Sequence, residues 1–99
     1  MLIRVWEYEV VEGSVSDFEQ TYGSEGPWAR LFESAAGFVG SELFRSTSTP
    51  GRYVTIDRFS DAESWRQFLT DHRDAYEKLD ALTAGMTLSE RELAAIELD

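Results

Sequence analysis

Residues 38–69, FVGSELFRSTSTPGRYVTIDRFSDAESWRQFL, place two strand patterns, a turn and the start of a helix in immediate succession. Phe38 to Thr47 and Arg52 to Phe59 are rich in β-branched and aromatic residues, which predicts two strands. Between them Pro50-Gly51 favours a tight turn, because proline presets the first turn angle and glycine accepts a positive φ. The two strands are therefore expected to form a hairpin. Ser60-Asp61-Ala62-Glu63 then has the form of a capping box that opens a helix.

The segment before the hairpin predicts a strand followed by an interrupted helical region. Leu2 to Val11 is rich in β-branched and aromatic residues, and apolar residues occur at both odd and even positions. It is therefore expected to be a strand with both faces partly covered. Ser16-Asp17-Phe18-Glu19 resembles a second capping box. The helix that it opens is interrupted by Gly23-Ser24-Glu25-Gly26 and restarts at Pro27, a residue suited to a first helical turn. Gly37 is expected to end this region.

After the hairpin, the pattern predicts a long helix and a closing strand. Apolar residues recur at helical spacing for nearly five turns; they are Trp65, Phe68, Leu69, His72, Tyr76 and Leu79. Gly85 is the expected terminator, with a restart of the helix possible near Thr70 or Asp71, and Glu92 to Leu98 is expected to be the last strand. The order strand, helix, strand, strand, helix, strand predicts one α+β domain over residues 1–99 with a ferredoxin-like βαββαβ fold and a four-stranded antiparallel sheet.

One face of this sheet is expected to remain uncovered within a single chain. Right-handed crossovers place both helices on the same face, and the opposite face still carries apolar residues. A second copy of the chain is the simplest cover, so a homodimer through the open sheet face is predicted.

Charge and composition limit the classes of molecule that are expected to bind the protein. Nineteen acidic against nine basic residues give a formal net charge of −10, which repels a phosphate backbone and an anionic membrane surface. Nucleic acid and membrane are therefore not expected as partners. No apolar run is long enough to span a bilayer, and no signal peptide is recognised. With no cysteine and one histidine, no zinc site is expected. These features favour a cytoplasmic protein.

Several stretches then resemble the antibiotic biosynthesis monooxygenase (ABM) family over nearly the whole chain. The first half of the resemblance lies in Trp6-Glu7-Tyr8-Glu9-Val10, Gly13, Phe18, Tyr22-Gly23, Gly26-Pro27-Trp28 and Leu31-Phe32. The second half lies in Gly37-Phe38-Val39-Gly40, Pro50-Gly51-Arg52-Tyr53, Ile56-Asp57-Arg58-Phe59-Ser60 and the pair Trp65 and Phe68. The resemblance implies a dimeric α/β barrel with the ligand held between each sheet and its own helices.

Members of that family differ in activity, and the resemblance implies three functions. The first is oxygenation of an aromatic or quinol-type small molecule with O₂ and no cofactor. The second is non-catalytic binding of a small ligand. The third is haem binding or degradation, with His72 as the available histidine; the haem-degrading branch also uses an asparagine, which this chain lacks.

Cofactor-free oxygenation requires an apolar pocket, a base and a donor for the developing oxyanion. The expected pocket walls are aromatic side chains: Trp6, Tyr22, Trp28, Phe32, Trp65 and Phe68. His72 is the first candidate base, because its unperturbed pKa lies near neutrality. Asp57 and Arg58 are candidate orienting groups, although strand alternation allows only one of the two to face the helices. Each of these residues also has a structural interpretation, in the core, at the dimer interface or in a surface ion pair.

Overall fold

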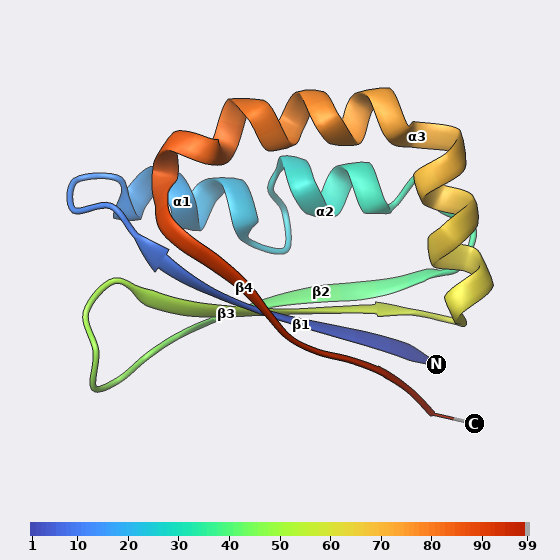
Figure 1. Ribbon diagram of the computed structural model, residues 1–99, viewed down its shortest axis with the longest axis horizontal. Coiled ribbons are helices and arrows are strands. Elements are labelled where there is room, and N and C mark those ends of the chain that lie inside the picture. The colour runs from blue at the N-terminus through green and yellow to red at the C-terminus, as the bar shows by residue number, and fades with distance from the viewer. Residues whose placement is uncertain (99) are drawn as a thin grey trace.

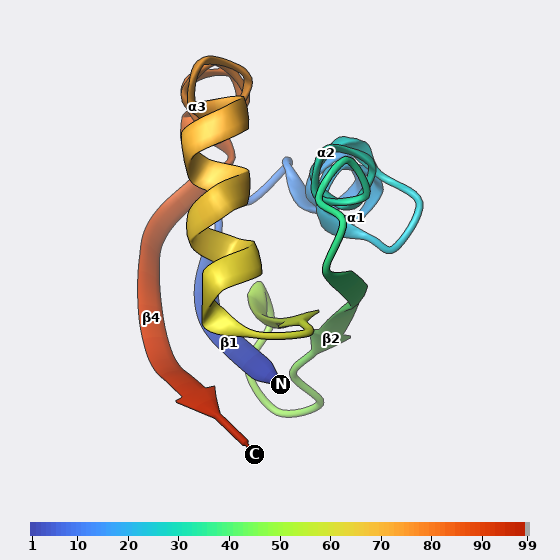
Figure 2. The same ribbon diagram turned by 90° about the vertical axis from the view of Figure 1, so that its right-hand side faces the viewer.

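The computed structural model describes residues 1–98 and confirms the predicted architecture of one sheet with helices on a single face (Figures 1 and 2). The elements in chain order are β1 (Leu2–Val10), α1 (Val15–Tyr22), α2 (Pro27–Phe32), β2 (Phe38–Arg45), β3 (Arg52–Phe59), α3 (Ala62–Thr83), the short 3₁₀ helix η1 (Ala84–Met86) and β4 (Thr87–Glu97). The sheet has the strand order β2-β3-β1-β4 and all of its pairings are antiparallel. No helix among the described residues is both long and apolar enough to cross a membrane.

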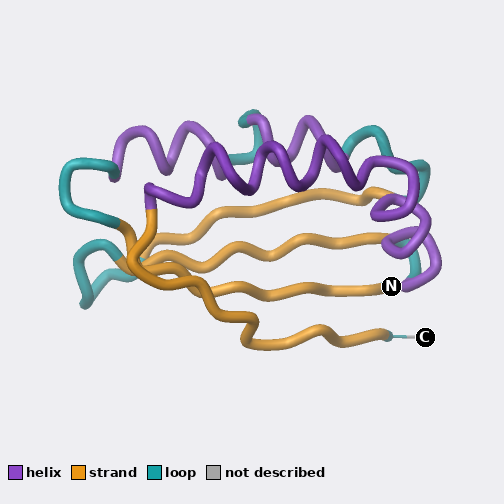
Figure 3. The backbone as a smooth tube through the Cα atoms, turned by 45° about the horizontal axis from the view of Figure 1, so that its top comes forward, coloured by secondary structure: helices purple, strands orange, loops and turns teal. Residues whose placement is uncertain are grey.

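The strands lie side by side beneath the helices (Figure 3), and their register decides which side chains face the helices. In the centre, Arg4 of β1 lies opposite Asp57 of β3, and Ser41 of β2 lies opposite Asp57 on its other side. Because side chains of directly paired residues share a face, these three polar residues lie on the helix-covered face. Asp57 and Arg4 are accordingly buried.

Aromatic rings make up most of the core between sheet and helices. The most completely buried large side chains are Phe18, Tyr53, Phe59 and Phe68. The Phe18 ring stacks on Tyr22 with a centroid separation of 4.2 Å, and Phe59 meets Trp65 edge-on at 5.1 Å. Such pairs add to the free energy gained by burying apolar area. The high aromatic content of the sequence is therefore used mainly in this single layer.

The helical region before the hairpin is divided where the sequence predicted a break, but its first cap differs. The capping box predicted at Ser16 is wrong, since α1 begins at Val15 and no side chain caps its N-terminus. Pro27 does occupy the first turn of α2. α2 ends at Phe32, before Gly37, which lies instead against Ser60 and Ser64.

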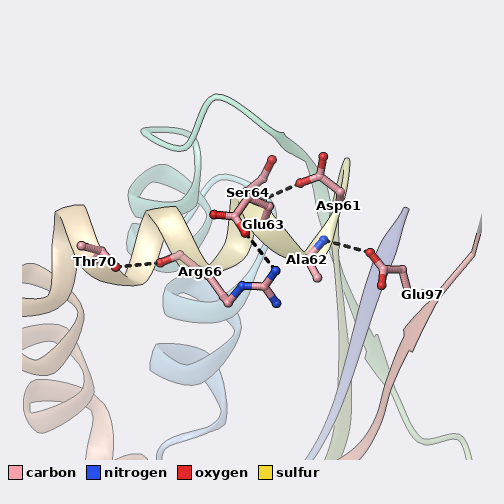
Figure 4. A network of polar contacts seen from close by, with 7 residues as sticks. All are labelled: Asp61, Ala62, Glu63, Ser64, Arg66, Thr70 and Glu97. Carbon is pink, nitrogen blue, oxygen red and sulfur yellow. Dashed lines mark hydrogen bonds and ion pairs between the residues drawn. The ribbon is translucent and has the colours of Figure 1, made fainter.

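The start of α3 is fixed by two side chains that accept hydrogen bonds from free helical N–H groups (Figure 4). Asp61 accepts from the Ser64 N–H at 2.7 Å, and Glu97 of β4 accepts from the Ala62 N–H at 3.1 Å. Asp61, and not the predicted Ser60, is thus the N-cap residue. The Glu97 contact also ties the last strand to the helix, which satisfies a donor that the helix itself cannot pair.

A bend divides α3 into two parts that point in different directions (Figure 1). His72 has non-helical angles, φ −125° and ψ 25°. Just before it, the Thr70 hydroxyl donates to the Arg66 carbonyl at 3.1 Å, an arrangement that commonly bends helices. The helix restart that the sequence allows near Thr70 or Asp71 corresponds to this bend.

The last strand begins earlier than predicted. β4 starts at Thr87 rather than Glu92 and pairs with β1 along its whole length, with register shifts opposite Val5/Trp6 and Glu9/Val10. A prediction based on apolar residues misses this start, because the run Ser89-Glu90-Arg91 is polar. β4 is an edge strand, where polar side chains are tolerated.

The sheet face away from the helices carries apolar residues that no described element covers (Figure 2). The residues are Ile3, Val5, Phe44, Val54, Ile56 and Ile96, which the strand register places on a common face. Phe44 and Ile96 are about half exposed. We call this set the open sheet face.

The close approach of Gly26 to the end of α1 predicts a large effect of substitution. A Cβ atom at Gly26 would lie 2.3 Å from the Gln20 carbonyl oxygen and 2.5 Å from that of Thr21. Gly26→Ala is therefore expected to lower the free energy of unfolding by about 1–3 kcal/mol, the usual cost of overpacking. The control is Gly85→Ala, because a Cβ there would meet no atom within 4 Å. Urea denaturation measures both variants, and equal stability of the two would contradict the packing argument.

Candidate functional site

A cavity of about 170 Å³ lies between the sheet and the helices. Every strand and all three α-helices supply side chains to it. They are Arg4, Trp6, Tyr8, Tyr22, Trp28, Ala29, Phe32, Ser41, Thr55, Asp57, Tyr76, Asp80 and Glu90. Aromatic rings form much of the wall, and the polar groups are concentrated on the sheet. This combination of an apolar body and a few polar groups is typical of small-molecule sites.

Asp57 is the buried carboxylate of the cavity. Its residue is only 7 % exposed. One carboxylate oxygen accepts a hydrogen bond from the Ser41 hydroxyl at 2.5 Å, and the other lies 4.0 Å from an Arg4 nitrogen. Burial raises the pKa of Asp57 above its ordinary value, while the Ser41 hydrogen bond and the Arg4 charge oppose that rise. The carboxylate is thus a stronger base than one on the protein surface.

Arg4 is the buried cation of the cavity, and the sequence reasoning missed it. Its guanidinium lies 3.8 Å from the centre of the Trp65 ring and 5.8 Å from that of Trp6. It also lies 4.0 Å from carboxylate oxygens of Asp57 and Glu92. The Trp65 ring and the two carboxylates together compensate a charge that would be costly to bury alone. The available signal was its place in β1, where Leu2, Arg4 and Trp6 share the inward face.

Hydroxyl groups occupy the middle of the cavity. The Thr55 hydroxyl donates to the Tyr8 hydroxyl at 3.2 Å, and burial raises the pKa of Tyr8. The Tyr22 hydroxyl donates to Thr83 at 3.2 Å and contacts Glu90 at 3.5 Å. Burial raises the pKa of Tyr22 to about 12. Both phenols therefore stay protonated at neutral pH and can act as hydrogen-bond donors.

Two carboxylates form the exposed rim of the cavity. Asp80 of α3 and Glu90 of β4 are the only exposed residues among those that line it. Partial burial, followed by the charge of Asp80, raises the pKa of Glu90. Among residues 1–98, no group of three or more histidine or carboxylate side chains is arranged to hold a metal ion.

The structure brings five of the predicted site residues together at this cavity: Trp6, Tyr22, Trp28, Phe32 and Asp57. The Trp28 indole nitrogen is buried and has no hydrogen-bond partner among the described residues.

The other predicted site residues lie elsewhere. Of Asp57 and Arg58, only Asp57 faces the helices; Arg58 lies on the open sheet face and pairs with Glu42. Phe68 is buried in the core, and Trp65 packs against Arg4 behind the cavity wall.

His72, the predicted base, does not reach the cavity. It lies beside Phe68, with ring centroids 5.4 Å apart, in a separate hollow between the first part of α3 and residues 34–37. The spacing of His72 with Trp65 and Phe68 suggested a common face for these residues. The bend at His72 itself breaks that helical periodicity.

Solved structures with the same fold cover almost the whole chain. A variant of SnoaB, a cofactor-independent oxygenase from Streptomyces nogalater, superposes with a TM-score of 0.73 and 18% identity, covering 98% of this chain and 91% of that one. A conserved protein from Methanosarcina mazei Go1 gives a TM-score of 0.72 at 14% identity, covering 100% and 94%. These likenesses establish the fold. No curated protein matches the chain by sequence.

A match to a family model shows the family of the chain in addition to its fold. The model of the antibiotic biosynthesis monooxygenase family matches residues 1–79, which include β1, β3 and the aromatic helices around the cavity. The chain therefore belongs to the antibiotic biosynthesis monooxygenase family.

Proposed function

We propose that the protein is a cofactor-independent monooxygenase that oxidises an aromatic or quinol-type small molecule with O₂ in the cavity between sheet and helices. The observation that supports this most directly is the Asp57 carboxylate, buried beside Ser41 in an aromatic cavity. Family membership and the fold shared with a cofactor-independent oxygenase add to it.

Asp57 replaces His72 as the proposed base. A general base has to reach the proton that it removes, and Asp57 lines the cavity whereas His72 does not. The raised pKa of Asp57 brings the basicity of its carboxylate closer to that of a phenol or an activated C–H group. Ser41 holds the carboxylate in place through its hydroxyl hydrogen bond.

The proposed reaction draws all of its electrons from the substrate. Asp57 accepts a substrate proton, and the resulting anion transfers one electron to O₂. The organic radical and superoxide then combine to a peroxide, which takes up a proton. The carbon that bears the peroxide then loses a hydrogen as a proton while the O–O bond breaks. This releases water and leaves a carbonyl group, so one oxygen atom enters the product and the other leaves as water. No external reductant is required for this balance.

Arg4 is the proposed stabiliser of the negative charge that moves through these steps. Its guanidinium lines the same cavity 4.0 Å from Asp57. A fixed cation in a site shielded from water stabilises a developing anion strongly. Trp65, stacked at 3.8 Å, is a positioning residue for this guanidinium.

The open sheet face supports the proposal of a homodimer. Six apolar side chains share this face, and two of them are about half exposed. Exposed apolar patches of this kind commonly mark protein–protein contacts. A second copy of the chain presents the same face and can cover it.

Asp57→Asn tests the base. The substitution keeps the shape but removes the proton acceptor, so O₂ uptake with a hydroquinone panel is expected to fall by about 10²–10⁴-fold. In the wild type, uptake is expected to fall as the pH drops through the Asp57 pKa, because the carboxylate must be ionised to accept a proton. Asp74→Asn, at an exposed site of α3, is the matched control. If His72→Ala abolishes uptake and Asp57→Asn does not, the base is His72.

Asp57→Asn lowers activity in this proposal, but its effect on stability is expected to become more favourable as the pH rises. Because the Asp57 pKa is raised on folding from its ordinary value of 3.8, the folded protein binds more protons than the unfolded chain as the pH rises past that value. Ionisation of Asp57 therefore lowers the free energy of unfolding with rising pH, until the folded carboxyl is also fully ionised. The difference in free energy of unfolding between Asp57→Asn and the wild type is therefore expected to shift in favour of the variant as the pH rises from acidic to neutral. Urea denaturation across this range measures the difference, and a constant difference would refute the assignment.

Ile56→Glu tests the dimer. A charge at the centre of the open sheet face cannot be buried without a partner, so the variant is expected to sediment as a monomer at micromolar concentration where the wild type is a dimer. Leu82→Glu, at a position 70% exposed on α3, is the control that leaves the dimer intact. A monomeric wild type would remove the proposal.

A further inference from the structure

The cavity has room for about one aromatic ring. Its volume is about 170 Å³, and an apolar cavity of about 150 Å³ in another protein binds benzene. A second fused ring would extend past the walls toward the rim carboxylates. The wall residues Phe32 and Trp28 are themselves buried in the aromatic core. Because such a core is closely packed, these side chains cannot move outward to enlarge the cavity.

The charges of the cavity oppose an anionic ligand. Among residues 1–98, Arg4 is the only cation that lines it, whereas Asp57, Asp80 and Glu90 are acidic. Arg4 is already paired with Asp57 and, outside the lining set, with Glu92. A carboxylate or phosphate on the ligand would therefore find no free cation and would pass the two rim carboxylates on entering. The net charge of −10 adds to this repulsion.

A cationic ligand is opposed by the interior. Behind the rim, the Asp57 carboxylate is already held by Ser41 and Arg4, so a cation that enters loses its hydration without gaining a free carboxylate. On the rim, Glu90 already contacts the hydroxyls of Tyr22 and Thr87. An uncharged ring with a hydroxyl group is not repelled by the acidic residues and has no charge to dehydrate. Its hydroxyl proton can be given to Asp57.

From size and charge together, we infer that the cavity selects an uncharged, single-ring phenol or hydroquinone and that Asp80 and Glu90 reject anionic relatives. The oxidation of this ligand rests on the proposed monooxygenase function, whereas its selection does not. Asp80 and Glu90 are thus specificity-determining residues. They act by electrostatic repulsion at the entrance.

Phenols that are not oxidised under the assay conditions separate binding from turnover. Calorimetry at low ionic strength compares para-hydroxyphenylacetamide with para-hydroxyphenylacetate, which match in shape and differ in charge. The amide is expected to bind at least about tenfold more tightly, and the preference is expected to shrink in high salt. Tyramine tests the cationic case and is expected to bind more weakly than the amide. In the size series para-cresol, a naphthol and an anthrol, affinity is expected to fall with each added ring.

Variants of Asp80 and Glu90 test directly whether these two residues cause the charge selection. In Asp80→Asn/Glu90→Gln, the amide and the acid are expected to bind within about twofold of each other. The control Asp74→Asn/Glu77→Gln removes the same charge from exposed positions of α3 that do not line the cavity, and is expected to keep the full preference. Both double variants conserve side-chain size, so a loss of folding is not expected to obscure the result.

Each outcome bears on one part of the inference. Equal binding of acid and amide by the wild type, or tighter binding of tyramine, would overturn the charge selection. Equal binding of the anthrol and para-cresol would overturn the size limit, and no binding of any phenol would overturn both. Binding of the neutral phenols without O₂ uptake on methylhydroquinone would instead leave the selection standing and remove the oxygenase function.

Discussion

Two opposite charges on neighbouring central strands, Arg4 and Asp57, are the constraint on which the site depends. Burying either charge alone would be costly, and even as a pair they need further partners. Ser41 supplies a hydrogen bond to the carboxylate, and Trp65 with Glu92 surrounds the guanidinium. The floor of the cavity is therefore polar, although the layer around it is aromatic. Both charges are thus held by strands and not by loops.

The sequence predicted the architecture because each element carries a local signal. The hairpin turn, the aromatic alternation in the strands and the break at Pro27 all follow from short-range steric rules, and the structure confirms them. β4 was predicted too short since the residues that begin it are polar and lie on an edge. Helix caps were misplaced by a residue or two. At α3, Ser60 and Asp61 are both suitable caps and only the backbone geometry selects Asp61, whereas at α1 the N-cap position falls on Ser14 and no side chain caps the helix.

The site was harder to predict because it depends on register and on one bend. Alternation requires that either Asp57 or Arg58 faces the helices, but only the strand pairing shows that it is Asp57. Arg4 was missed because a charged residue near the start of a strand is usually exposed. His72 was favoured for its intrinsic pKa and its helical spacing, and the bend at that residue removes the spacing argument. Chemical type alone therefore favoured His72, which lies outside the cavity, over Arg4, which lines it.

The rim and the floor of the cavity come from different parts of the chain. The matched region ends at residue 79, one position before Asp80, so Arg4 and Asp57 fall inside it while Asp80 and Glu90 fall outside. The groups proposed for chemistry and those proposed for selection thus belong to separate parts of the chain. With the roles proposed above, a substitution at Asp80 or Glu90 would change which molecule enters the cavity and would leave Arg4 and Asp57 as they are.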